Sequence, residues 1–433
     1  MPRDVFLVTI DCWRWDALKA MPRLRSRTES WQQRPAICAG HATNWAFPAI
    51  LNGTYYPRAY TESGELKSGT RPLPQVLGEK GYRRRGVVGS NVYLAKWEPY
   101  FDAYWNDGME GEDAAMYGSD VEKWATRAFL TLAMRKRAPI EEVIDRVRAG
   151  RPVPARSLQG NNGKGEHENG DESKSGSGSE GKPRFDWIHL MDLHMPFYPG
   201  IGRAAGVGLV ESYRAVVEFY RRGNDASERT LRTIQRLYWA CVKRLDERID
   251  LLFETIPKDA VVIVLGDHGE DFGHGVYGPL QPYDECLKVP LLARNLPDLP
   301  ETVRQIDVPA HLLDALGVPI PEQWDSDLDR EEFVAPFLSP GARNEELFAG
   351  VRTRDRKLIR TYDAETLRHT TTEMYDLDQD PNEQRDLSER EQASDLEEYL
   401  DAFIEREEIG KVIDPRENAS EAARERLEEL GYM

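Results

Sequence analysis

A short apolar segment that ends abruptly in charged residues constrains the fold of this chain most strongly. Residues Val261 to Leu265 are all apolar, which predicts a strand buried on both faces within a parallel sheet. Gly266, Asp267 and His268 follow directly. Ligands of open α/β sheets bind just beyond the carboxyl ends of strands, and an adjacent Asp and His offer an oxygen and an imidazole to a divalent metal. We therefore predict a metal site here, with a polar turn and a surface His as the structural alternative.

The first predicted strand of the chain also ends on an acid. Residues Val5 to Ile10 are mostly apolar, and Asp11 follows them. Two strands that end in acids bring those acids together if they are neighbours in one sheet. Asp11 is therefore predicted to bind the same metal ion as Asp267 and His268, because that ion needs further oxygen ligands. A cap for the next helix is the less favoured reading of Asp11.

A third predicted strand, Phe185 to Met191, is followed by Asp192 and His194. His189 lies inside this strand, where a histidine is more often a packed core residue than a ligand. His194 lies beyond the end of the strand. We therefore predict a functional role for His194 and a structural one for His189.

Thr43 lies just ahead of a predicted short helix that has Pro48 in its first turn and ends at Asn52-Gly53. A hydroxyl at this place is at the positive end of the helix dipole, where anionic esters bind favourably and where it can serve as a nucleophile. An ordinary capping role is equally compatible with the position.

The composition excludes several classes of partner. The 433 residues carry a net charge of −18, which argues against nucleic acid and anionic membranes as main partners. No stretch approaches the roughly 18 apolar residues of a membrane span. The four cysteines are scattered without a CxxC pair, and the first residues lack the apolar core of a signal peptide. We therefore expect a cytoplasmic protein without a membrane span.

The chain is predicted to contain one large and one small part. Residues 1–340 alternate between strand and helix patterns, which indicates an α/β domain. Residues 341–433 are predicted to form a small antiparallel sheet followed by charged helices, which extend over 389–430. Within the large part, residues 121–148 have a helical amphipathic pattern. Residues 156–182 are almost devoid of apolar side chains, which predicts a disordered insertion.

The order of the motifs resembles the sulfatase family of the alkaline phosphatase superfamily. The resemblance rests on VTIDCWRWD, FPAILNGTYYP, HLMDLHMPFYP, LGDHGEDFGHGVYGP, PYDECLKVPLL and EMYDLDQDPNEQRDLS, in this order. It covers most of the chain except the insertion and the last helices. It implies an α/β/α sandwich with a mostly parallel central sheet, and a small C-terminal subdomain with antiparallel strands.

The resemblance also implies roles for six residues, each matched by its position. The metal ligands are Asp11, Thr43, Asp267 and His268. Thr43 matches the family's nucleophile, ten positions before the glycine of its CxPSRxxLLTG signature, here Gly53. The histidines that contact the ester oxygens or the leaving group match His194 and His274.

The chain departs from the family pattern at the nucleophile. Sulfatases have a Cys or Ser there, which is converted to formylglycine, followed by a Pro and an Arg. The corresponding residues here are Thr43, Trp45 and Phe47. Cys38, the nearest cysteine, is not in the modification motif. Cys12 replaces the second acid of many members, so one divalent metal ion (Mn, Mg or Ca) is expected rather than two.

We therefore predict a metal-dependent hydrolase or transferase of sulfate or phosphate esters that acts on small anionic substrates. Covalent catalysis through Thr43 resembles that of phosphate-handling superfamily members, so phosphate esters are favoured. A sulfatase that works without formylglycine is one alternative. A non-catalytic binding protein that retains the fold is the other, and Phe47 in place of the motif's Arg supports it. The presence of all six predicted site residues argues against it.

Overall fold

The computed structural model describes most of the chain. The predicted insertion lies outside the described residues except for positions 181 and 182, and the predicted helices at 121–148 and 389–430 lie partly outside. The described residues are 2–61, 64–107, 136, 138–149, 181–201, 206–341, 345–390 and 393–407.

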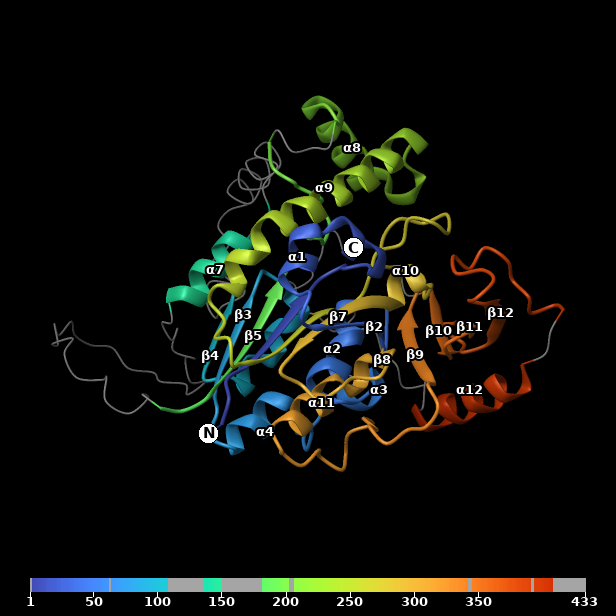
Figure 1. Ribbon diagram of the computed structural model, residues 1–433. Helices are drawn as coiled ribbons and strands as arrows, with labels where there is room; N and C mark the ends of the chain where they lie inside the picture. Colours follow the sequence, from blue (N-terminus) through green and yellow to red (C-terminus); the bar gives the residue numbers. More distant parts are fainter. Residues whose placement is uncertain are drawn as a thin grey trace, which may run out of the picture.

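An eight-stranded mixed sheet forms the centre of the larger part (Figure 1). Its strands are β1 (Val5–Ile10), β2 (Gln32–Ile37), β3 (Arg83–Val88), β4 (Ala103–Asn106), β5 (Arg184–Leu190), β6 (Val261–Gly266), β7 (Lys288–Arg294) and β8 (Val303–Arg304). The order is β4-β3-β5-β1-β6-β7-β2-β8. The strands from β4 to β6 are parallel, whereas β7 runs antiparallel to both β6 and β2. The mostly parallel sheet that the sequence predicts is thus confirmed.

The apolar strands β1 and β6 lie in the middle of this sheet, and all of their residues are buried. Phe6, Val8 and Ile10 pack on one face of the sheet, and Val5 and Leu7 on the other. Burial of each large aliphatic side chain stabilises the fold by about 1.5–3 kcal/mol. This burial fixes the two strands whose carboxyl ends carry the predicted ligands.

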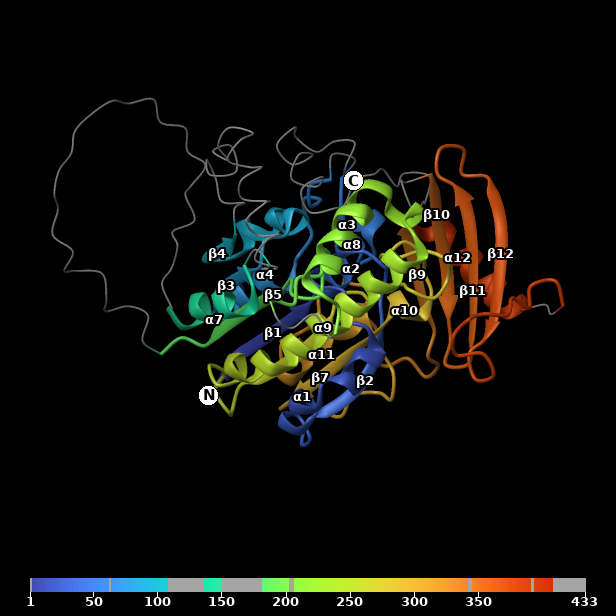
Figure 2. The ribbon, with the colours of Figure 1, turned by 90° about the horizontal axis from the view of Figure 1, so that it is seen from above.

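Helices cover both faces of the sheet, as Figures 1 and 2 show. One face is covered by η1 (Trp15–Ala20), α1 (Pro22–Arg27), α7 (Ile140–Ala149), α8 (Leu209–Arg222) and α9 (Glu228–Phe253). The other face is covered by α2 (Thr43–Asn52), α3 (Tyr56–Ala59), α4 (Leu73–Glu79) and α11 (Val308–Ala315). Among the described residues, this part of the chain also contains η2 (Val92–Tyr100), η3 (Gly223–Asp225), α10 (Asp284–Leu287) and η4 (Gln305–Asp307). None of the helices in the described residues is long and apolar enough to cross a membrane.

A separate four-stranded antiparallel sheet follows near the C-terminus, with the order β12-β11-β10-β9. Its strands are β9 (Ala335–Pro340), β10 (Glu346–Arg352), β11 (Arg356–Asp363) and β12 (His369–Asp376), and α12 (Ser394–Glu407) packs on β10. The predicted antiparallel sheet is confirmed. The sequence indicated only its last three strands, because β9 contains two prolines and lacks regular alternation.

The helix near Thr43 differs from its prediction. It begins at Thr43 itself, with Pro48 inside it rather than in its first turn. Its N-cap is Ala42, and no side chain caps it. Gly53 ends the helix in the left-handed conformation, with φ 56°, as predicted. Since Thr43 does not cap the helix, its hydroxyl is available for other contacts.

Candidate active site

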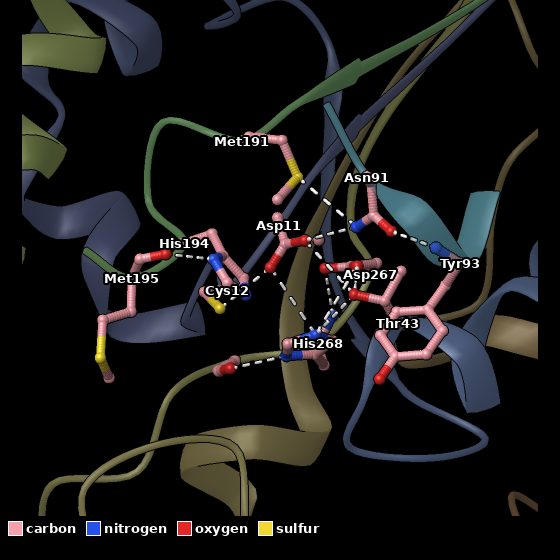
Figure 3. Close-up of polar contacts among 12 residues, drawn as sticks. Asp11, Cys12, Thr43, Asn91, Tyr93, Met191, His194, Met195, Asp267 and His268 are labelled. Atoms are coloured by element: carbon pink, nitrogen blue, oxygen red, sulfur yellow. Dashed lines mark hydrogen bonds and ion pairs between the residues drawn. The ribbon is translucent and has the colours of Figure 1, made fainter. Parts of the chain in front are cut away.

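Asp11 and Asp267 directly follow the ends of two neighbouring strands. Asp11 follows β1, Asp267 follows β6, and the last residues of these strands, Ile10 and Gly266, are paired in parallel register. Parallel neighbours end at the same edge of a sheet, so the two carboxylates point into the same space (Figure 3). Both residues are fully buried. The predicted convergence of two strand ends is therefore present.

The Thr43 hydroxyl points into the same space from the first turn of α2 (Figure 3). Its oxygen lies 3.3 Å from Oδ2 of Asp11, 3.2 Å from Oδ2 of Asp267 and 3.2 Å from Nε2 of His268. Thr43 is 1% exposed. We call Asp11, Thr43, Asp267 and His268 the Thr43 cluster.

Backbone contacts fix the orientation of His268. Its Nδ1 lies 2.9 Å from the carbonyl oxygen of Gly269, which can only accept, so Nδ1 carries the proton of the neutral ring and Nε2 presents its lone pair to Thr43. The backbone amide of His268 donates to Oδ1 of Asp267 at 2.7 Å. A Cβ atom on Gly269 would lie 1.9 Å from the carbonyl oxygen of Glu285, so this turn requires glycine.

The pKa values of the two carboxylates of the cluster are shifted in opposite directions. Burial, followed by repulsion from Asp11, raises the pKa of Asp267 well above its usual value. Burial also acts to raise the pKa of Asp11, but His194, His189 and His268 together hold that pKa well below its usual range. Two buried carboxylates at this separation cannot both ionise unless a positive charge lies between them.

The donor atoms of the cluster suit a divalent cation. Thr43 has one proton and can donate it to only one of the two carboxylates. Within the described residues, no lysine or arginine forms an ion pair with Asp11 or Asp267. Carboxylate, hydroxyl and imidazole donors are ligands of Mn²⁺ and similar ions, and buried charges require a partner. Asp11, Thr43, Asp267 and His268 would hold such an ion.

Cys12 contacts the cluster without adding a second acid. Its thiol donates to Oδ1 of Asp11 at 3.0 Å, and burial followed by the charge of Asp11 raises its pKa. Its backbone has a positive φ of 55°, which is strained for a residue with a side chain. Asp11, Cys12 and His268 also offer donor atoms within 4.8 Å of one another, and one metal ion rather than two stays a prediction.

His194 is close enough to Asp11 for each residue to shift the pKa of the other (Figure 3). Its Nδ1 donates to the carbonyl of Met195. Burial lowers its pKa to about 4, although the charge of Asp11 acts in the opposite direction. Burial therefore favours the neutral form of the ring.

His274 has a different environment from the other five predicted residues. Its Nδ1 lies 3.3 Å from Oδ1 of Asp271, its Nε2 lies 3.0 Å from the carbonyl oxygen of Asn382, and its ring stacks on Tyr283 at 3.7 Å. These contacts join two loops and do not include the Thr43 cluster. A role for His274 toward the ester thus stays a prediction.

The sequence did not indicate two buried neighbours of Asp11. Asn91 directs its Nδ2 toward Oδ2 of Asp11 at 3.4 Å. His189, which was expected to be a packed core histidine, has its Nε2 3.5 Å from the same oxygen. The pairing of β5 with β1 places His189 beside Thr9, and thus near Asp11. The sequence alone does not give this pairing, because it depends on the order of the strands in the sheet.

Comparison with known proteins identifies the family. The sequence profile of the Sulfatase family matches residues 3–318. The chain belongs to the sulfatase family. This membership places it among ester-hydrolysing enzymes of the alkaline phosphatase superfamily. No curated protein matched the chain.

Solved sulfatase-family and related structures share the fold. A phosphonate monoester hydrolase from Silicibacter pomeroyi superimposes with a TM-score of 0.60 at 16% identity, over 93% of this chain and 95% of that one. The phosphonate monoester hydrolase of Agrobacterium radiobacter gives 0.58 at 13% identity, over 95% and 96%. A protein solved with its substrate D-glucosamine-2-N,6-O-disulfate gives 0.62 at 14% identity, over 94% and 98%. At these identities the likeness shows the fold alone.

In this sulfatase-family chain, two positions that follow Thr43 belong to the core. Trp45 stacks on Tyr56 with ring centroids 3.9 Å apart. Phe47, at the position of the motif's Arg, is fully buried and packs against Trp187 and His189 at 5.2 and 5.3 Å. Phe47 therefore supplies packing where the family pattern supplies a charge.

Proposed function

We propose that this chain is a metal-dependent hydrolase or transferase of small anionic esters, with Thr43 as its nucleophile, and that it prefers phosphorus esters to sulfate esters. The observation that carries the proposal is the position of the Thr43 oxygen, within 3.3 Å of the side chains of Asp11, Asp267 and His268. A buried hydroxyl among two carboxylates and an imidazole is the arrangement expected of an activated nucleophile.

The residues of the cluster have distinct roles in the proposed reaction. Thr43 attacks the ester in line with the leaving oxygen, and its proton passes to a neighbouring carboxylate. A divalent cation held by the cluster would lower the pKa of the Thr43 hydroxyl and offset the charge of the ester. His194 binds an ester oxygen and protonates the leaving oxygen once the anion has raised its pKa. Water or another alcohol then releases the group from Thr43.

The preference for phosphorus esters rests on the nucleophile itself. Thr43 occupies the position of the Cys or Ser that sulfatases convert to formylglycine, and a threonine hydroxyl resembles that of phosphate-handling superfamily members. Two of the structural relatives act on phosphonate monoesters, as their names state, whereas another, with a TM-score of 0.61, is named as a 2-O GAG sulfatase. The relatives are compatible with either ester, so the preference depends on the nucleophile.

Turnover of four chromogenic esters tests the proposal. The esters are nitrophenyl phosphate, bis-nitrophenyl phosphate, nitrophenyl phenylphosphonate and nitrophenyl sulfate, each with Mn, Mg or Ca. At least one phosphorus ester is expected to be hydrolysed faster than the sulfate. Thr43→Val keeps the shape of the side chain and is expected to lower kcat/KM by about 10³-fold or more, whereas Thr43→Ser retains a hydroxyl and much of the activity.

Two outcomes would contradict the proposal. Sulfate turnover above every phosphorus ester favours a sulfatase that acts without formylglycine, and full activity of Thr43→Val excludes Thr43 as the nucleophile. The non-catalytic alternative has Phe47 in its favour. It would be supported by a folded protein that neither turns over an ester nor retains a metal.

A further inference from the structure

His189 is buried directly beside the Thr43 cluster. It lies on β5, is 0% exposed and pairs across the sheet with Thr9 of β1. Its Nε2 is 3.5 Å from Oδ2 of Asp11, and no hydrogen bond of regular geometry satisfies this nitrogen. Asp11, His189 and Asp267 each offer a donor atom, and these atoms all lie within 4.8 Å of one another. A buried nitrogen that faces a carboxylate without a hydrogen bond of regular geometry requires a proton or a cation beside it.

The opposite side of the imidazole is held by a short hydrogen-bond chain. Nδ1 of His189 lies 2.9 Å from the hydroxyl oxygen of Thr9. That oxygen accepts a hydrogen bond from Nε1 of Trp187 at 3.0 Å, and the hydroxyl also lies 3.4 Å from the carbonyl of Ile188, to which it donates. If the Thr9 proton lies on that carbonyl, Nδ1 donates to Thr9 and Nε2 carries the lone pair; if Thr9 donates to Nδ1 instead, Nε2 carries the proton and faces Asp11. Histidines that bind metals are usually held in the first of these ways.

Packing keeps the ring in this orientation. Phe47 meets the ring nearly at right angles, with centroids 5.3 Å apart, and it belongs to the helix that begins with Thr43. The residue that replaces the motif's Arg therefore holds His189 between the nucleophile helix and the sheet. A ligand placed by packing and a hydrogen bond needs little reorganisation to bind.

We propose that His189 is a further ligand of the cation, together with Asp11, Thr43, Asp267 and His268. This inference rests on the cation site of the proposed function. A site with two imidazoles, two carboxylates and a hydroxyl selects a transition ion such as Mn²⁺ over Mg²⁺ or Ca²⁺, which prefer oxygen donors. The competing reading is a core histidine whose Nε2–H donates to Asp11 and only positions that carboxylate.

Counting the imidazole nitrogens bound to Mn²⁺ tests the inference without measuring activity. Electron spin-echo spectroscopy of the Mn²⁺-loaded full chain is expected to show two coordinated imidazoles in the wild type and one in His189→Gln, whose amide can still donate to Asp11. Calorimetry is expected to show that His189→Gln binds Mn²⁺ about 100-fold more weakly, with a smaller loss for Mg²⁺. His311→Gln, on α11, serves as the control and is expected to leave both measurements unchanged.

The outcomes separate the two proposals. If the wild type binds none of these cations, the cation site of the proposed function fails, and this inference fails with it. If Mn²⁺ binds with one imidazole in both the wild type and His189→Gln, only the inference about His189 is overturned. If His189→Gln does not fold, Thr9→Val replaces it. That variant removes the hydroxyl that holds Nδ1 and is expected to weaken Mn²⁺ binding by about tenfold or more, and unchanged binding overturns the inference.

Discussion

Two buried clusters of charged side chains in this protein differ in how their charges are balanced. The Thr43 cluster contains the carboxylates of Asp11 and Asp267 and, within the described residues, no lysine or arginine paired with them. The second cluster, which we call the interface cluster, lies where the small sheet meets α10. Its members are Asp284, Arg352, Lys357 and Glu383.

The interface cluster neutralises itself. Nζ of the fully buried Lys357 lies 2.8 Å from Asp284 and 2.6 Å from Glu383, and a guanidinium nitrogen of Arg352 lies 2.8 Å from Asp284. Although burial acts to raise the pKa of Asp284, Lys357 and Arg352 hold it well below its usual range. Two cations balance two carboxylates, so the cluster is complete in the folded chain. The Thr43 cluster lacks this balance, which supports the proposal that it binds a cation from solution.

The same substitution at the two clusters is expected to produce the largest contrast. Asp267→Asn keeps the shape of the side chain but removes a ligand and a repulsive charge. We expect the affinity for Mn²⁺ and the activity to fall by about 10³-fold or more, while the free energy of unfolding of the metal-free protein stays the same or rises by about 1–2 kcal/mol. Asp284→Asn is expected to destabilise the protein instead. Denaturant unfolding of both variants measures this difference. Equal losses in the free energy of unfolding for Asp267→Asn and Asp284→Asn would contradict the prediction.

Removal of a cation from the interface cluster is expected to have the next largest effect. Lys357→Met leaves Asp284 and Glu383 with Arg352 alone, so we expect a loss of about 3–5 kcal/mol in the free energy of unfolding, with Mn²⁺ affinity retained in the folded fraction. Arg354→Met removes an exposed cation near the same strand and is expected to change stability by less than about 0.5 kcal/mol. Similar losses in the two variants would show that the cluster does not stabilise the protein.

Metal removal is expected to affect only the Thr43 cluster. A cation at 100 times its dissociation constant stabilises a folded protein by about 2.7 kcal/mol. We expect a chelator to lower the Tm of the wild type, and we expect the effect to disappear in Asp267→Asn but not in Arg354→Met. A chelator effect that persists in Asp267→Asn would place the metal elsewhere.

The smallest expected effect concerns the pH dependence of stability at His274. Burial acts to lower the pKa of His274, but Asp271 raises it above that of an unfolded histidine. The folded state thus binds the proton more tightly than the unfolded state. The stabilisation from protonated His274 is therefore fully present below about pH 6.5, and it is lost as the pH rises through the higher pKa of His274 in the folded state. His274→Gln is expected to lower the free energy of unfolding by less than about 1 kcal/mol at pH 6, and by a still smaller amount at pH 9. Urea unfolding at both pH values measures this, and a larger loss at pH 9 would contradict the assignment.

The sequence by itself determined the centre of the fold and most of the candidate site. Strands β1 and β6 are apolar segments that end in polar residues, and this local pattern predicted their existence, their burial and the acids at their ends. The resemblance of residues 43–53 to the family signature pointed to Thr43. The strand pattern is local, because a strand buried on both faces is apolar unless a charged residue within it has a partner, as Asp186 of β5 has in Arg85.

Only the tertiary structure decided which of these side chains meet. The place of β1 between β5 and β6 brings Thr9 beside His189, and it turns a predicted core histidine into a neighbour of Asp11. The start of α2 at Thr43 decides that the hydroxyl faces the carboxylates instead of capping the helix. The ion pair between Lys357 and Asp284 likewise depends on the tertiary structure, because the two residues are far apart in the chain. Charge balance depends on distances of a few ångströms between distant segments, and strand order and packing set those distances.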